Sequence, residues 1–114
     1  MLDWFSSKCL DSITPVGPAV VTLEEIGPQL RDKEVSVVTR VNGREVQRAK
    51  IADMIFDIPA LVAFISSRVR LRPGDVIATG TPPGVGASTG TFLTAGDTVE
   101  VDIAPIPVLR ITIV

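Results

Sequence analysis

An Asn42-Gly43 pair stands between two short runs of alternating residues, and it constrains the fold more than any other feature of the sequence. The run Val35–Val41 precedes the pair, and the more polar run Arg44–Arg48 follows it. A two-residue type I′ turn needs positive φ at both central positions, and Asn followed by Gly satisfies that need with little strain. The sequence therefore predicts an antiparallel hairpin that turns at these two residues.

Further strands are predicted towards both ends of the chain. In Thr98–Ile103 and again in Leu109–Ile113, apolar and polar residues alternate as in a strand with one buried face. The β-branched run Ala19–Leu23 follows a Pro-Val-Gly-Pro turn and predicts another strand. The polar stretch Glu24–Lys33, broken by a Gly-Pro pair, predicts a loop. The chain is therefore expected to be mainly β.

One amphipathic helix is predicted, with Asp57 as its N-cap and Pro59 in its first turn. Apolar residues recur on one face of this helix at helical spacing: Ile58, Leu61, Val62, Ile65 and Val69. We expect the helix to cover one face of the sheet. Because no linker divides the chain, the sequence predicts one domain of the α+β class, mainly β with one covering helix.

The segment Leu71–Gly86 holds the richest set of candidate binding residues. Its predicted strand, Val76–Ala78, runs into a loop in which hydroxyl residues alternate with Gly and Pro. Proline fixes its own φ, whereas glycine adopts backbone conformations closed to other residues. Such a loop can hold Thr79, Thr81 and bare backbone N–H groups against a small oxygen-rich ligand. It matches neither a P-loop nor a dinucleotide fingerprint, and an ordinary tight turn is the alternative explanation.

Composition limits the chemistry that this chain can perform. Its 114 residues carry a formal net charge of −2, no histidine, no tyrosine and one cysteine. Without histidine, the chain lacks the side chain best suited to proton transfer near neutral pH and the commonest ligand of transition metals. The absence of a basic stripe argues against nucleic acid as a partner, and no apolar run reaches the ~20 residues of a membrane span. One cysteine, and no signal-peptide pattern in Met1–Phe5, favour a cytoplasmic protein.

Several polar side chains outside the loop need no functional role to explain their presence. On spacing alone, Lys8 is interpreted as a solvated surface charge. Gln47 and Lys50, on and just beyond the return strand of the hairpin, are also interpreted as solvated. Asp75 and Asp97 each follow a glycine just before a strand, which is typical of turn-capping residues.

Taken together, these segments resemble the fumarylacetoacetate hydrolase family, and the resemblance covers nearly the whole chain. The motifs that carry it are, in chain order, K-x-x-D at Lys8–Asp11, P-V-G-P-A-V-V-T-L-E-E-I, V-N-G-R-E-V-Q-R, D-M-I-F-D-I-P-A-L-V-A-F-I-S, L-R-P-G-D-V-I-A-T-G-T-P-P-G-V-G and F-L-T-A-G-D-T-V-E-V-D-I. The tail from Ala104 onward departs from the family, which usually carries an I-E-G-L-G-like turn there. The resemblance identifies residues 1–114 as a partial fumarylacetoacetase-like C-terminal domain.

The resemblance implies a mixed β-roll or β-sandwich whose pocket binds a divalent cation, Mg²⁺ or Mn²⁺. The implied substrates are small 2-oxo acids and related compounds: fumarylacetoacetate, acylpyruvates, oxaloacetate, ureidoglycolate and hydroxymuconate-type diacids. The implied chemistry is hydrolysis, C–C or C–N lysis, or isomerisation through a metal-stabilised enolate. By the same resemblance, Lys8 stabilises anionic charge and Thr81 hydrogen-bonds a carboxylate or keto oxygen of the substrate. Thr79, Gly80 and Pro82 would shape that wall of the pocket.

The resemblance also predicts what this chain lacks. Family members carry their metal ligands, an E-x-E pair and a later Asp, upstream of the position matched by Lys8, and the carboxylates of this chain do not replace them. We therefore expect no metal ligand here, weak cation binding or none, and exposed apolar surface that favours a homodimer or other self-association. Two alternatives to an enzyme stay open: a catalytically inert remnant that at most folds or self-associates, and a module that binds a carboxylate without metal.

Overall fold

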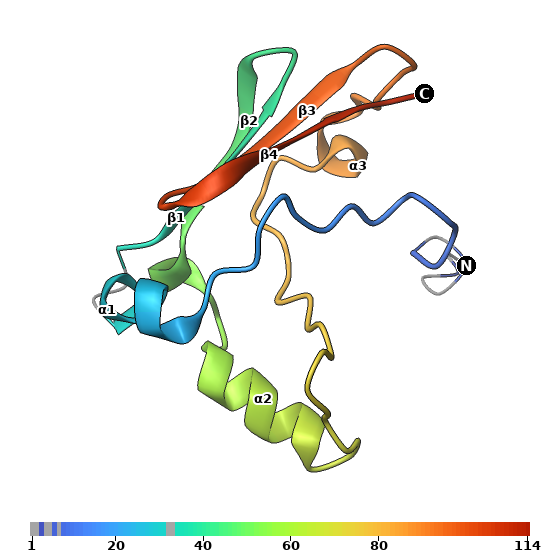
Figure 1. Cartoon of the computed structure of the whole chain (residues 1–114). Coiled ribbons are helices and arrows are strands. Elements are labelled where there is room, and N and C mark those ends of the chain that lie inside the picture. Colours follow the sequence, from blue (N-terminus) through green and yellow to red (C-terminus); the bar gives the residue numbers. More distant parts are fainter. Residues whose placement is uncertain (1–2, 4–5, 7, 32–33) are drawn as a thin grey trace.

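The centre of the fold is a sheet of four antiparallel strands in the order β2-β1-β3-β4 (Figure 1). The computed structural model describes residues 3, 6, 8–31 and 34–114, so the prediction that Met1–Phe5 is no signal peptide falls mostly outside the described residues. The strands are β1 (Ser36–Val41), β2 (Arg44–Lys50), β3 (Thr98–Ile103) and β4 (Ile106–Thr112). The helical elements are α1 (Leu23–Arg31), the 3₁₀ turn η1 (Ile51–Asp53), α2 (Ile58–Ser66) and α3 (Gly86–Thr89). The mainly β fold class is confirmed, and the sequence predicts each of these strands.

The turn of the β1–β2 hairpin has φ values of 50° at Asn42 and 78° at Gly43, which confirms the predicted turn. Asn42 also ties this turn to β3. Its side-chain amide donates to Asp97 Oδ1 at 2.8 Å and accepts from the Thr98 backbone N–H at 2.9 Å. Hydrogen bonds from the Asn42 amide, and then from the backbone and hydroxyl groups of Thr94, lower the pKa of Asp97. The tip of the hairpin is therefore fixed to the neighbouring strand.

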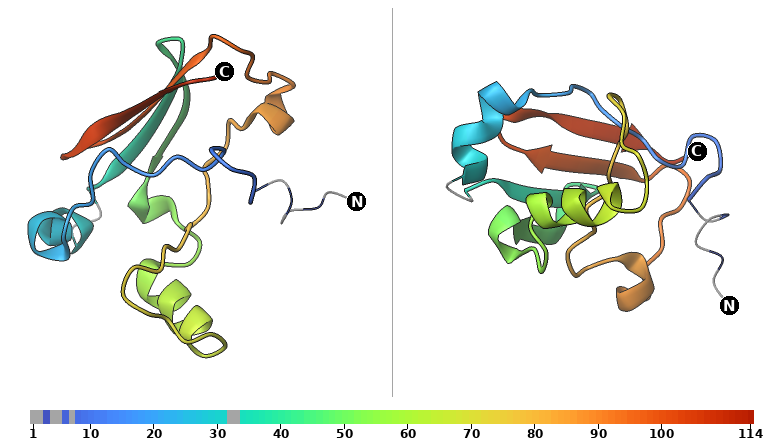
Figure 2. Two further views of the ribbon diagram at one scale, coloured as in Figure 1. Left: turned by 45° about the vertical axis from the view of Figure 1, so that its right-hand side comes forward. Right: turned by 90° about the horizontal axis from the view of Figure 1, so that it is seen from below.

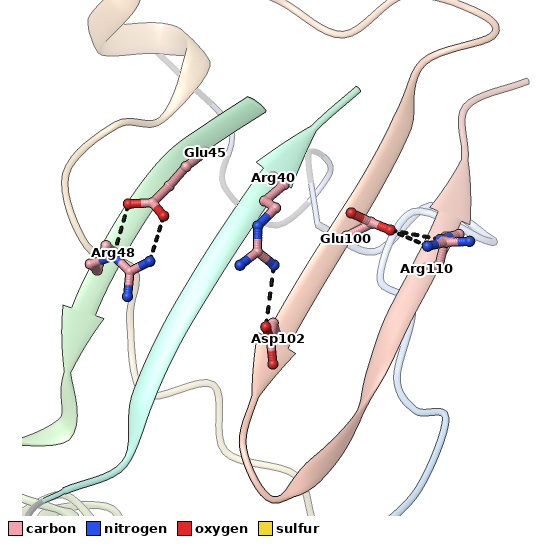
Figure 3. A network of polar contacts seen from close by, with 6 residues as sticks. All are labelled: Arg40, Glu45, Arg48, Glu100, Asp102 and Arg110. Carbon is pink, nitrogen blue, oxygen red and sulfur yellow. Dashed lines mark hydrogen bonds and ion pairs between the residues drawn. The ribbon is translucent and has the colours of Figure 1, made fainter. Parts of the chain in front are cut away.

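The two faces of the sheet differ in character. One face carries ion pairs, which join Arg40 to Asp102, Arg48 to Glu45 and Arg110 to Glu100 (Figure 3). The other face is apolar, and the turn formed by residues 15–17 lies against Val101, Ile103 and Leu109 around a small hollow of about 230 Å³. The N-terminal segment therefore occupies the apolar face.

The segment after this turn has no regular structure up to Thr22 and then forms a helix, where the sequence predicts a strand and then a loop. The predicted strand Ala19–Leu23 is wrong, because residues 19–22 form no strand and Leu23 begins α1. The predicted loop Glu24–Lys33 is wrong in its described part, which is helical and includes Pro28. Acidic residues in the first turn of α1 and a basic residue in its last turn suit the helix dipole. The Ile26 side chain of this helix is buried, with only 8% of its surface exposed. Burial of this side chain stabilises the helix through tertiary packing, which the helix propensities of the residues do not include.

α2 begins where the sequence predicts but does not lie where we expect it. The carboxylate of Asp57 accepts a hydrogen bond from the Ala60 backbone N–H at 2.9 Å, which confirms the predicted N-cap. Figure 1 and the left view of Figure 2 show the helix set apart from the strands, however, and none of its residues is buried. The expectation that it covers a face of the sheet is wrong, because the N-terminal segment takes the apolar face and η1 leads the chain away from β2.

The chain exposes more surface than a compact protein of its size. Its accessible surface is 9108 Å² for a mass of 12.1 kDa, whereas a compact monomer of that mass exposes about 6,000 Å². Among the described residues the buried hydrophobic side chains are Ile26, Val35 and Val38. By contrast, Val20 and Ile55 are 90% and 92% exposed, in agreement with the prediction of exposed apolar surface. In the part of the chain that the structure describes, no helix is long and apolar enough to cross a membrane.

Candidate functional site

The segment Leu71–Gly86 leads from α2 back towards the sheet without pairing to it (Figure 1). The prediction of a strand at Val76–Ala78 is wrong, because no described strand lies beside this stretch to complete its backbone hydrogen bonds. The prediction of capping residues is confirmed. Asp75 accepts from the backbone N–H three residues earlier at 2.7 Å, and Asp97 accepts from the equivalent N–H at 2.8 Å.

Gln47 on β2 holds the hydroxyl-bearing loop in place. Its Nε2 donates to Thr81 Oγ1 at 3.0 Å and to the Pro82 carbonyl oxygen at 2.8 Å. Because β2 is the edge strand of the sheet, the loop is attached at that edge. The interpretation of Gln47 as a solvated residue is therefore wrong. Its partners lie 34 and 35 residues away, so no local sequence pattern reveals the contact.

Gly84 brings the backbone of the same loop close to β2. Its φ is 107°, and a Cβ atom at this position would lie 2.2 Å from the Val46 carbonyl oxygen and 3.1 Å from Gln47 Cγ. Both the backbone conformation and the lack of space require glycine here. Gln47 and Gly84 therefore attach the loop to β2 at two neighbouring points.

The loop forms one wall of a hollow of about 520 Å³. Thr79 through Pro83 line this wall. Apolar residues from β1, η1 and α2 and from the connection between the two helical elements line much of the rest: Val37, Ile51, Met54, Ile55, Phe56 and Leu61. Arg48, Lys50 and Asp53 supply its charged side chains. The cavity thus combines an apolar interior with a few polar groups, as small-molecule sites commonly do.

The structure brings four of the five predicted site residues together. Thr79, Gly80, Thr81 and Pro82 share one wall of the hollow, whereas Lys8 is not among its lining residues. Lys8 lies in an exposed turn whose geometry is supported by a hydrogen bond from Thr14 Oγ1 to the Lys8 carbonyl oxygen at 3.2 Å. The roles of all five residues stay predictions.

The carboxylates of the described residues do not gather into a metal site. No group of three or more potential metal ligands occurs among them. Glu24 and Glu25 lie in the first turn of α1, where hydrogen bonds from the Glu24 backbone and the Thr22 hydroxyl lower the pKa of Glu24. Glu100 and Asp102 are engaged by arginines on neighbouring strands. Glu24, Glu100 and Asp102 therefore have structural partners, and the arrangement of the described carboxylates does not fit a divalent cation.

The chain thus forms a mainly β domain with a loop-lined pocket. A Gly-Pro loop is attached to the edge of its small antiparallel sheet, beside an apolar hollow. A family model described as the fumarylacetoacetate (FAA) hydrolase C-terminal domain matches residues 1–114. The chain belongs to the fumarylacetoacetate hydrolase family. It is 43% identical over 108 residues to the oxaloacetate tautomerase YisK of Bacillus subtilis, a match that covers 93% of this chain and 35% of that protein.

Solved structures share this architecture. The fumarylacetoacetate hydrolase of Exiguobacterium antarcticum is 36% identical, with a TM-score of 0.86 over 95% of this chain and 38% of that one. The fumarylpyruvate hydrolase of Pseudomonas aeruginosa, solved in complex with Mn²⁺ and pyruvate, is 29% identical, with a TM-score of 0.63 over 70% of this chain and 32% of that one. The chain spans between 31% and 44% of the length of the curated relatives that it matches. The family includes hydrolases, isomerases and tautomerases.

Proposed function

We propose that this chain forms the oxo-acid-binding wall of an enzyme of the fumarylacetoacetate hydrolase family. In this proposal the Thr81 hydroxyl hydrogen-bonds a carboxylate or keto oxygen of the substrate, and Thr79, Gly80 and Pro82 shape the wall around it. The observation that carries the proposal is that these residues line the hollow while the Gln47 amide holds Thr81. A fixed hydroxyl beside bare backbone suits a small, oxygen-rich anion.

The relatives support 2-oxo acids as the substrate class. One is named as an oxaloacetate tautomerase, and another is a fumarylpyruvate hydrolase solved with Mn²⁺ and pyruvate. Oxaloacetate and pyruvate both place a carboxylate beside a keto group, and all of these oxygens accept hydrogen bonds. We propose hydrolysis, lysis or keto–enol isomerisation of such an acid as the reaction of the complete enzyme.

In this proposal the described residues form the wall that binds the oxo acid, and they supply no metal ligand. Mg²⁺ or Mn²⁺ would supply Lewis-acid polarisation in the complete enzyme, but the described residues do not offer a cluster that fits the ion. The family resemblance assigns the Lys8 ammonium to negative charge on the substrate, but Lys8 does not line the hollow, so we propose this role for the complete enzyme only. Thr81 donates a hydrogen bond and orients the acid.

Calorimetric titration of the chain with oxaloacetate, first in Mg²⁺ and then in excess chelator, tests this proposal. We expect a measurable heat of binding, and a loss of affinity of at least about tenfold in Thr81→Ala, because this change removes a hydrogen-bond partner of a charged ligand oxygen. Thr112→Val deletes a hydroxyl from the exposed end of β4 and should bind like the unaltered chain.

The two arms of the titration separate the alternatives. An absence of heat under both conditions would contradict the proposal and support a catalytically inert remnant. Binding that persists unchanged in chelator is expected, because the described residues offer no cluster that fits the ion, and a module that recognises the carboxylate without metal shares this result. Binding that requires Mg²⁺ would contradict a wall without metal ligands. Binding that Thr81→Ala does not weaken would place the ligand elsewhere on the chain.

A further inference from the structure

The orientation of the Gln47 amide is fixed by its neighbours. The Pro82 carbonyl oxygen can only accept a hydrogen bond, so the atom 2.8 Å from it must be the amide nitrogen. The same nitrogen lies 3.0 Å from Thr81 Oγ1. Both N–H bonds of the amide are therefore used, one on the Pro82 carbonyl and one on the Thr81 hydroxyl.

This orientation has a consequence for the Thr81 hydroxyl. A hydroxyl group has one proton to donate and two lone pairs with which to accept. Because Thr81 Oγ1 accepts from Gln47, one lone pair is occupied and the proton stays available for another partner. Thr81 lines the hollow, so that partner can be a ligand inside it.

We infer that Gln47 is a positioning residue that makes Thr81 a hydrogen-bond donor, and that the site thereby selects ligands with an acceptor oxygen over ligands with an N–H group. A carboxylate offers an acceptor at both of its oxygens, whereas a primary amide offers one acceptor oxygen and one NH₂ group, so only one of its two orientations satisfies such a donor. The ligand selectivity rests on the proposed function. The contact between the Gln47 amide and the loop stands on geometry alone.

Gln47→Glu reverses the polarity of this contact. A carboxylate cannot donate to the Pro82 carbonyl, and it would accept the Thr81 proton, which leaves only lone pairs for a ligand. We expect the affinity for pyruvate to fall at least about tenfold, and the affinity ratio of pyruvamide to pyruvate to rise by a similar factor. Titration calorimetry with pyruvate and pyruvamide measures both quantities.

Two further variants test the effect of added net charge and the effect of losing the contact without a new charge. Gln29→Glu introduces the same charge on an exposed position of α1 and should leave both affinities unchanged. Gln47→Leu is neutral and frees the hydroxyl to rotate, so it should reduce the discrimination between the two ligands without inverting it. Equal loss of pyruvate and pyruvamide binding in Gln47→Glu would overturn the inference.

A measurement without ligand tests the contact separately. In the unaltered chain, the side-chain N–H groups of Gln47 should exchange with solvent at least about tenfold more slowly than those of exposed Gln29, as observed by NMR. Thr81→Val should accelerate that exchange. Equal exchange at the two glutamines would overturn the inference. Slow exchange at Gln47 in a chain that binds neither compound would support the contact and contradict the proposed function.

Discussion

Gly84→Ala should detach the Gly-Pro loop from β2 and lower the free energy of unfolding by about 3 kcal/mol or more. At a φ of 107°, an alanine Cβ strains the backbone, and it would also lie 2.2 Å from the Val46 carbonyl oxygen. Because the Cβ position is set by the backbone and the oxygen belongs to the Val46 backbone, no side-chain rotation can relieve this contact. Denaturant unfolding measures the loss, and hydrogen exchange at Thr79–Thr81 reports whether the loop has left the edge of the sheet.

Gly74→Ala is the matched control for this prediction. Gly74 has a similar φ of 95°, but nothing lies within 4 Å of a Cβ atom built there. Its substitution should therefore carry only the backbone strain of about 1–2 kcal/mol. If the two variants lose the same stability and the loop exchanges normally in both, the close approach of Gly84 to β2 does not contribute to the fold.

The isolated chain should self-associate at micromolar concentrations. Its accessible surface of 9108 Å² exceeds the surface of a compact monomer of its mass by about half. Apolar groups as exposed as Val20 and Ile55 gain free energy by leaving water, at roughly 25 cal/mol for each Å² buried. Sedimentation velocity over a concentration series should show species larger than 12.1 kDa.

Two variants of α2 test whether its exposed apolar surface drives that association. Phe64 is 59% exposed, and Phe64→Lys removes a large apolar group from the helix. Ala63→Lys adds the same charged side chain at a neighbouring exposed position but removes little apolar area. We expect Phe64→Lys to shift the mass distribution towards monomer more than Ala63→Lys does. A chain that stays monomeric at every concentration would contradict the prediction.

The features that the sequence predicts correctly depend on contacts within a few residues. The turn at Asn42-Gly43 follows from the φ preferences of its two residues, and the cap at Asp57 from one side chain and the amide three residues later. The alternation in Thr98–Ile103 follows from the difference between the two faces of a sheet. The errors at α1 and α2 have the opposite origin. The apolar face of the sheet is occupied by residues 15–17, which are distant in sequence from the strands that they contact, and no local pattern shows this.

The same division applies to the candidate site. Thr79–Pro82 can be predicted because the alternation of hydroxyl residues with Gly and Pro is visible locally. Gln47 cannot be predicted in this way, because its role depends on a loop that crosses the sheet edge 34 residues later. Gly84 is visible as a glycine, but the short distance to the Val46 carbonyl that makes it necessary is a tertiary contact.

Mapping of the bound acid by NMR tests the central claim, that the Gly-Pro loop is the oxo-acid wall, most directly. In a titration of the ¹³C,¹⁵N-labelled chain with oxaloacetate, we predict that the largest shift changes fall on Thr79–Pro82 and on the side-chain amide of Gln47. The second hollow, between residues 15–17 and the β3–β4 hairpin, is the internal control and should stay unchanged. Shift changes confined to that second hollow, or saturating binding that leaves Thr81 unperturbed, would contradict the claim.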